Sequence, residues 1–242
     1  MIVLSVGMPR AGSGWHYNLI HDLMKTTGCA DAREIRQKYG LQKILTEVNC
    51  NIGVLSLRRL GMATIPALAG KTFVVKAHSA PTPWSRLLLT LGLLRITYIY
   101  RDPRDAMLSA FEFGQRVLSK GRPNAFSHLS DFEKTLDFMA EYVLIWERWQ
   151  AEKGVLVARY EDLLRDYNNE TARLVEFLGL DGSRPEVQAV IEAYRPGAAE
   201  ERQGLHFYKG KIGRFREAYS PEQQAVLAGR FGPYLEKMGY EI

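Results

Sequence analysis

The apolar positions of the chain fall into two patterns. Short continuous runs rich in β-branched and aromatic residues lie at residues 2–6, 72–75, 96–100 and 155–158, and such runs are typical of strands buried on both faces of a sheet. Longer segments, in which apolar residues recur every three or four positions, predict helices at residues 13–25, 103–114, 131–152, 168–178, 185–194 and 221–231. Ser13 is the expected N-cap of the first helix, and Pro103 stands in the expected first turn of the second.

The alternation of strands and helices predicts an α/β fold. We expect three layers, with a central, mostly parallel sheet flanked by helices. A chain of 242 residues suits one such domain, so residues 1–242 are expected to form a single domain.

Polar clusters directly follow all four predicted strands, at residues 10–13, 76–78, 101–104 and 159–162. Because ligands of open parallel sheets bind beyond the carboxyl ends of the strands, these clusters are candidate binding residues. A merely solvated rim of the sheet is the competing interpretation. Charges gather at buried strand ends too rarely for that interpretation to be favoured.

The loop at residues 7–14 joins the first strand to the first helix. Its glycines permit the left-handed backbone that turns successive N–H groups toward one point, and the helix start adds further donors. Arg10 brings a positive charge and Ser13 a hydroxyl. A nucleoside triphosphatase loop would carry lysine where Ser13 stands, so the loop favours an anion site of another kind. A glycine-rich turn without a ligand remains the structural alternative.

Composition and charge narrow the function classes only partly. The 32 Lys and Arg against 27 Asp and Glu give a formal charge of +5, which suits either nucleic acid or a small polyanion. The 2 cysteines form neither a disulfide framework nor a metal motif. The longest apolar stretch, residues 87–94, ends at Arg95 and is too short for a membrane span, and the amino terminus lacks the pattern of a secretory leader. We therefore expect a cytoplasmic protein.

Residues 9–15 resemble the phosphosulfate loop of sulfotransferases that use 3′-phosphoadenosine 5′-phosphosulfate (PAPS), written PKSGTTW or PRSGTT. The resemblance implies a P-loop-like nucleotide-binding architecture. It also implies that Arg10 neutralises the 5′ phosphosulfate, that Trp15 packs against the adenine, and that the loop between them binds the donor through Ala11, Gly12, Ser13 and Gly14. Gly14 departs from the family's second threonine, so one hydroxyl contact is replaced by a backbone N–H.

Two further segments resemble motifs of the same family. Residues 98–111 match its 3′-phosphate motif, which assigns Arg101 and Ser109 to that phosphate, although the acids of this segment also suit an ordinary helix start. Residues 74–78 match the KxH element, which makes His78 the general base and Lys76 its assistant in sulfuryl transfer. A lone histidine is otherwise more often structural than catalytic.

The resemblance weakens towards the carboxyl terminus. Residues 205–215 resemble the family's RKGxxGDW loop, in which Lys209 and Gly210 fit but Tyr208 replaces the arginine that contacts the 3′ phosphate. Lys211, Arg214 and Arg216 are candidates to replace that arginine. Residues 159–163 match the YEDL segment and place Tyr160 near the adenine, with a structural role at the sheet end as an equal alternative.

These motifs predict a sulfotransferase that moves a sulfuryl group from PAPS to an acceptor hydroxyl and releases adenosine 3′,5′-bisphosphate (PAP). His78, Lys76 and Arg10 are the expected catalytic residues, and the two cations would replace a metal. The alternatives are an atypical P-loop small-molecule kinase and a non-catalytic nucleotide-binding protein. The expected partner is a small-molecule or glycan acceptor and not nucleic acid, because the basic residues gather at strand ends. Residues 29–70, 112–130 and 195–208, including His206, are expected to wall the acceptor site, whose ligand the sequence leaves open, as it does the oligomeric state.

Overall fold

A computed structural model describes residues 1–197 and 210–242. Its centre is a single sheet of four parallel strands in the order β2-β1-β3-β4. The strands are β1 (Ile2–Gly7), β2 (Phe73–Ala77), β3 (Leu94–Tyr100) and β4 (Val155–Arg159). All four predicted strands are confirmed, with bounds that differ by a residue or two.

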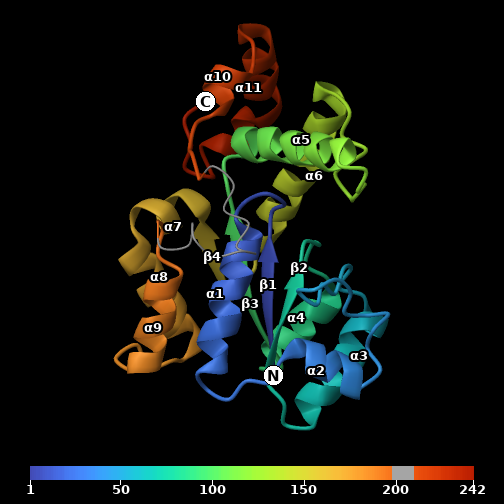
Figure 1. Cartoon of the computed structure of the whole chain (residues 1–242), viewed down its shortest axis with the longest axis vertical. Helices are drawn as coiled ribbons and strands as arrows, with labels where there is room; N and C mark the ends of the chain where they lie inside the picture. The colour runs from blue at the N-terminus through green and yellow to red at the C-terminus, as the bar shows by residue number, and fades with distance from the viewer. Residues whose placement is uncertain (198–209) are drawn as a thin grey trace.

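Helices cover both faces of this sheet (Figure 1). One face packs against α1 (Ser13–Lys25), α7 (Tyr160–Arg165), α8 (Tyr167–Leu178) and α9 (Pro185–Ala193). The other packs against α2 (Ala32–Lys38), α3 (Leu57–Leu68), α4 (Pro83–Thr90) and α6 (Phe132–Gln150). The helices α5 (Pro103–Ser119), α10 (Phe215–Ala218) and α11 (Pro221–Leu235) lie beyond the carboxyl ends of the strands, where α11 packs on α6. The predicted three-layer α/β fold is therefore confirmed.

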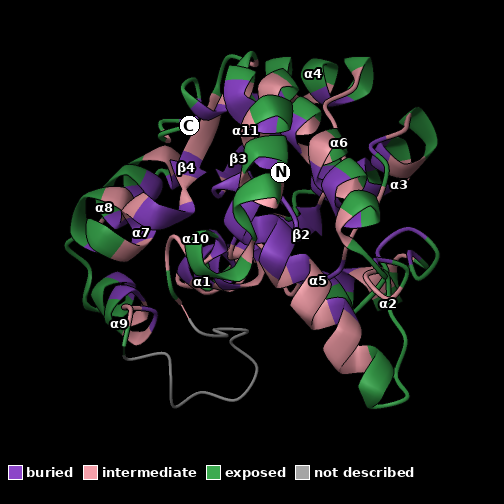
Figure 2. Cartoon of the chain, turned by 90° about the horizontal axis from the view of Figure 1, so that it is seen from above, coloured by how far each residue is buried: buried purple, intermediate pink, exposed green. Residues whose placement is uncertain are grey.

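The pleat of β1 explains why the sheet has two cores. Ile2, Leu4 and Val6 point into the core on the α6 side, whereas Val3 belongs to the core under α1. Successive side chains of a strand alternate between faces, so a continuous apolar run is what a strand covered on both sides requires. Figure 2 shows where the chain is buried, with buried residues concentrated on the strands and exposed ones on the outer faces of the helices.

The helices show where sequence patterns were insufficient. The six predicted helices are present, but α2, α3, α4, α7 and α10 were not predicted. Of these, α3 contains Pro66 within its length, a residue that normally ends a helix, and α7 and α10 are too short for a periodic pattern. The predicted cap at Ser13 is wrong. Gly12 occupies the N-cap position with φ 75, and Ser13 is the first helical residue, because the tight loop needs the left-handed conformation at that point.

In the part of the chain that the structure describes, no helix combines the length and the apolarity needed to cross a bilayer. Cys29 and Cys50 are both free thiols. That residues 1–242 form one domain stays a prediction.

Candidate active site

Two glycines shape the loop between β1 and α1. A Cβ atom on Gly7 would lie 2.7 Å from Ile99 Cγ2, and a Cβ on Gly12 would lie 2.6 Å from the ring of Tyr160. Neither position has space for a side chain, so the loop can pass close to the neighbouring strand and to α7. The first N–H groups of α1, which have no acceptor within the helix, consequently open onto the cavity above the sheet.

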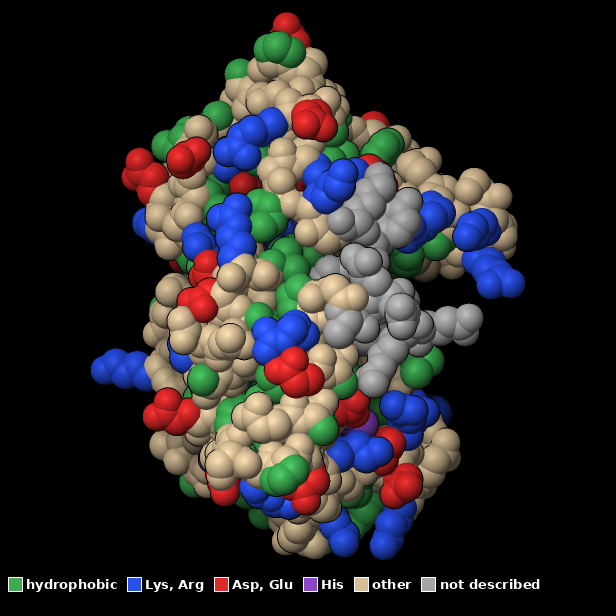
Figure 3. Space-filling view, turned by 60° about the vertical axis from the view of Figure 1, so that its left-hand side comes forward, with side chains coloured by type: hydrophobic (Ala, Val, Ile, Leu, Met, Phe, Trp, Pro, Cys, Tyr) green, Lys and Arg blue, Asp and Glu red, His purple; other side chains and the backbone are tan. Residues whose placement is uncertain are grey.

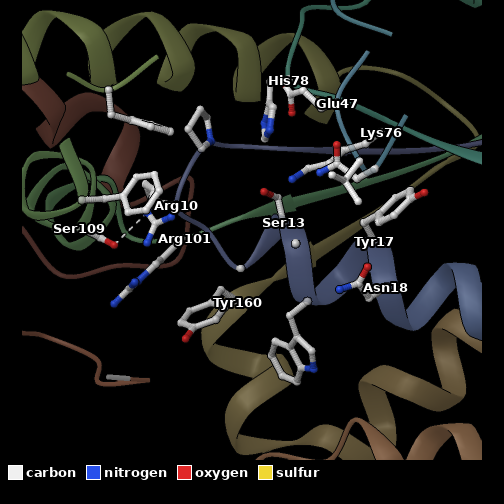
Figure 4. A pocket seen from close by; sticks show the side chains of 18 residues that line it. Arg10, Ser13, Tyr17, Asn18, Glu47, Lys76, His78, Arg101, Ser109 and Tyr160 are labelled. Carbon is white, nitrogen blue, oxygen red and sulfur yellow. Dashed lines mark hydrogen bonds between the residues drawn. The ribbon is translucent and has the colours of Figure 1, made fainter. Parts of the chain in front are cut away.

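That cavity has a volume of about 370 Å³ and brings together most of the predicted site (Figure 4). The predicted residues that line it are Arg10, Gly12, Ser13, Gly14, Trp15, Lys76, His78, Arg101, Ser109 and Tyr160. Ala11 is completely buried, and Gly210 is not among the lining residues. Lys209, Tyr208 and His206 lie outside the described residues. Of the fourth polar cluster only Tyr160 reaches the cavity, since Arg159 pairs with Asp162.

His78 follows β2 and has one ring nitrogen fixed by the backbone. Its Nδ1 lies 2.6 Å from the carbonyl oxygen of Gly7. Because a carbonyl oxygen can only accept, Nδ1 carries the proton and Nε2 keeps its lone pair. Burial, with the nearby charge of Lys76, lowers the pKa of His78 to about 4. The side chain is therefore neutral at pH 7 and has one nitrogen able to take a proton.

Lys76 is the last residue but one of β2, and its side chain is buried. Burial lowers its pKa to about 8; the carboxylate of Glu47 opposes this shift and Arg10 adds to it. No hydrogen bond or ion pair of its ammonium occurs within residues 1–197 and 210–242. A buried cation of this kind gains strongly from an anion placed beside it.

Arg10 lies in the left-handed region with φ 64, an uncommon conformation for a residue with a side chain. Its Nε donates to Ser109 Oγ at 3.2 Å, and its guanidinium stacks 4.4 Å from the ring centre of Phe113. Burial and two neighbouring arginines, Arg116 and Arg101, lower its pKa to about 10. Arg10 therefore points to the residues expected at the 3′ phosphate, and its assignment to the 5′ phosphosulfate stays a prediction.

Arg101 ties this end of the cavity to the carboxyl-terminal loop. Its Nη2 donates to Lys211 O at 2.7 Å and to Asp105 at 3.1 Å, while its Nε is buried with no partner among the described residues. Asp105 also accepts the backbone N–H groups of Gly213 and Phe215, at 2.7 Å and 3.0 Å. The acids of the α5 start thus have a structural role, and Arg101 keeps a donor for a ligand.

Two of the three candidates to replace the family arginine at Tyr208 are engaged elsewhere. Arg214 pairs with Glu112, and Arg216 stacks on Phe215 and lies 3.7 Å from Glu241. Neither of them lines the cavity, nor does Lys211. Which residue takes the role of that arginine stays open.

The sequence profile described as "Sulfotransferase domain" matches residues 2–239. The chain belongs to the sulfotransferase family. It is 27% identical to an amine sulfotransferase of Oryctolagus cuniculus, over 40% of this chain and 34% of the relative, and 27% identical to cytosolic sulfotransferase 17 of Arabidopsis thaliana, over 56% and 47%. The matches therefore span between a third and a half of the length of these relatives.

Solved structures show the same fold. A retinol dehydratase crystallised with retinol and PAP superposes with a TM-score of 0.64 at 18% identity, covering 97% of this chain and 81% of that one. The mouse sulfotransferase SULT7A1 complexed with PAP gives 0.60 at 16% identity, with 95% and 81% covered. These likenesses confirm the sulfotransferase fold that the motifs implied.

Two aromatic residues that line the cavity also support its walls. Trp15 stacks on Tyr167 and donates from Nε1 to Tyr194 O at 3.0 Å, so most of its ring is buried. Tyr160 lies against Gly12 and carries the guanidinium of Arg101 4.8 Å from its ring centre. Both alternatives for Tyr160, the structural and the binding role, are compatible with this position.

Sequence reasoning missed five residues that line the cavity. Glu47, Val48 and Asn49 form one rim, whereas Phe113 and Phe126 lie beside Arg10. These residues fall inside the expected acceptor segments 29–70 and 112–130, but nothing in the sequence singled them out. Other apolar residues in or near these segments do not line the cavity: Leu55 and Leu60 are in the core, whereas Leu57, Trp84 and Leu87 are exposed elsewhere.

Proposed function

We propose that the chain is an enzyme that transfers the sulfuryl group of PAPS to an acceptor, with His78 as general base. One observation carries the proposal. A neutral histidine and three cations, Arg10, Lys76 and Arg101, line the same cavity at the start of α1. This arrangement suits a polyanionic donor beside a group that accepts a proton.

The residues present fit the donor. The N–H groups at the start of α1 and the ammonium of Lys76 would hold the 5′ phosphosulfate. Arg101, whose buried Nε lacks a partner among the described residues, would hold the 3′ phosphate with Ser109, and Arg10 would lie between the two groups. Tyr160 and the part of Trp15 that lines the cavity would contact the adenine.

In the proposed mechanism, PAPS supplies the sulfuryl group and PAP is its product. His78 takes the acceptor proton on Nε2, since Nδ1 is bonded to Gly7 O. Lys76 balances negative charge beside the reacting group. The negative charge of the donor would raise the pKa of His78 from about 4 towards neutrality, which strengthens the base when the donor is present.

The alternatives are less well supported. A kinase would need the lysine that Ser13 replaces. On the face drawn in Figure 3, Lys and Arg side chains are interspersed with Asp and Glu instead of forming the basic stripe that nucleic acid requires. We propose a small-molecule acceptor, a metal-independent reaction and a cytoplasmic enzyme, the last in line with the names of the cytosolic relatives.

Calorimetry with PAP, ATP and AMP tests the donor. We expect PAP to bind without added magnesium and much more tightly than ATP or AMP. Transfer of labelled sulfuryl from PAPS to a panel of hydroxyl and amine acceptors then tests the reaction. Equal binding of the three nucleotides, or none, would overturn the proposal, and magnesium-dependent ATP turnover would favour the kinase.

A further inference from the structure

The loop at residues 46–51 forms one rim of the cavity and is held in place by the rest of the chain. Arg36 of α2 donates from Nη1 to the carbonyl oxygen of Glu47 at 2.8 Å. Thr46 and Asn51 close the loop with two backbone hydrogen bonds, of 2.9 Å and 2.7 Å. The loop is therefore a fixed part of the fold.

The same loop is attached to the strand that carries the catalytic lysine. The N–H of Lys76 donates to Cys50 O at 3.4 Å, and the N–H of Ile52 donates to Lys76 O at 2.9 Å. The position of the loop is thus set relative to Lys76 and, two residues on, to His78.

Glu47 adopts an unfavourable backbone conformation in this loop. Its φ is 61, in the left-handed region, which costs a residue with a side chain about 1–2 kcal/mol. Glycine or asparagine would fit this position better. Residues in sparsely populated backbone conformations concentrate at functional sites. The conformation of Glu47 therefore points to a function for its carboxylate.

The charge of Glu47 is opposite to that of its surroundings. Among the described residues that line the cavity, it is the one acid beside three cations. Figure 4 shows it on the side of His78 and Lys76, away from Arg101 and Ser109. Its carboxylate makes no hydrogen bond or ion pair within the described ranges, and its charge raises the pKa of Lys76 only through space.

The carboxylate of Glu47 would repel a polyanionic donor. Its position at the acceptor end of the cavity is therefore explained if a positive charge of the acceptor binds there. We propose that Glu47 selects acceptors that carry a positive charge, such as a protonated amine, and holds them beside His78. This inference rests on the proposed sulfuryl transfer and names the acceptor class. It makes Glu47 a specificity-determining residue.

A competing role for Glu47 is to act only on the protonation of Lys76. If Glu47 served only to keep Lys76 protonated, its removal would slow transfer to every acceptor alike and would shift the alkaline limb of the pH–rate profile. A charge-selecting Glu47 instead affects cationic acceptors alone. The two roles therefore separate when matched acceptors are compared.

The test uses tyramine, a phenol with a protonated aminoethyl chain, and tyrosol, in which a hydroxyl replaces the amine. Their binding to the PAP complex is measured by calorimetry and their sulfation by initial rates, for the wild type, Glu47→Gln and Glu34→Gln. Glu34 is an exposed acid of α2 that does not line the cavity, so its variant is the matched control. A second pair, aminohexanol and hexanediol, repeats the comparison with alkyl alcohols.

We expect the wild type and Glu34→Gln to prefer the cationic member of at least one pair by about fivefold, the value of a partly exposed ion pair. Glu47→Gln should lose that preference while binding the neutral member as before. Equal affinity for both members in the wild type, an equal loss of both in Glu47→Gln, or binding of no member of either pair would overturn the inference. Failure of the proposed function is a different result, because PAP itself would then not bind.

Discussion

The two halves of the cavity are built in different ways. The half lined by Arg10, Arg101, Ser109 and Tyr160 is made of residues that follow strands or lie on α5 and α7. Two contacts tie them together: Arg10 donates to Ser109, and Arg101 stacks on Tyr160. The half lined by Glu47 to Asn49 is a loop tip, where Val48 is 78% exposed. The first arrangement suits the proposed donor, which is the same in every reaction. The second would allow the proposed acceptor to differ without a change in the donor half. His78 and Lys76 lie where the halves meet.

The largest expected effect is on turnover, and it concerns His78, where the two halves meet. His78→Ala should lower kcat by about 100-fold or more, the usual loss of a general base, while PAP affinity is retained. His78→Asn can still donate to Gly7 O and so preserves the local contact, yet it should be equally slow. Steady-state kinetics and calorimetry check both variants. Near-normal turnover of His78→Asn would show that His78 is not the general base.

The second effect tests the half of the cavity that is proposed to bind the donor. Arg101→Gln should weaken PAP binding by about 10- to 100-fold, as expected for a lost charged hydrogen bond, and leave AMP binding unchanged because AMP has no 3′ phosphate. Arg104→Gln is the control. Arg104 is also buried at the α5 start, but it pairs with Asp102 and does not line the cavity. A similar loss of PAP and AMP affinity in Arg101→Gln would contradict the assignment of the 3′ phosphate.

The third effect is one of stability. The pKa of His78 is lowered from 6.5 to about 4 in the folded chain, so the unfolded chain binds more protons between these values. Stability is therefore complete above pH 6.5 and falls as the pH drops towards 4, by about 2 kcal/mol for His78 between pH 7 and pH 5. His16, whose pKa is lowered to about 3 by burial and Lys76, contributes in the same direction.

Urea unfolding at pH 7 and pH 5 measures this loss. His78→Asn should lose less stability than the wild type over this range, and bound PAP should reduce the loss in the wild type, because donor charge raises the pKa of His78. An identical pH dependence of the variant and the wild type would show that His78 is already protonated at pH 5.

The contrast between the halves also explains what the sequence could predict. Parallel strands end at one edge, so Arg10, Lys76 and Arg101 were predicted to meet although they are far apart in sequence. The loop at residues 46–51 has no periodic pattern, and its position depends on the hydrogen bonds to Arg36 and to the backbone of Lys76. Glu47 consequently looked like any surface acid. The direction of the Arg10 side chain was equally hidden, since the choice between Ser109 and the 5′ group depends on packing against Phe113.

Asp105 connects the carboxyl-terminal segment to Arg101, although the two are far apart along the chain. This one completely buried carboxylate bonds Arg101 and the N–H groups of Gly213 and Phe215, which are 108 and 110 residues away. Arg101 in turn holds Lys211 O. A deletion that begins at residue 211 would therefore reach the cavity: it would leave Asp105 as a buried anion with fewer partners, and it would remove one of the hydrogen bonds that position Arg101, the residue proposed to bind the 3′ phosphate.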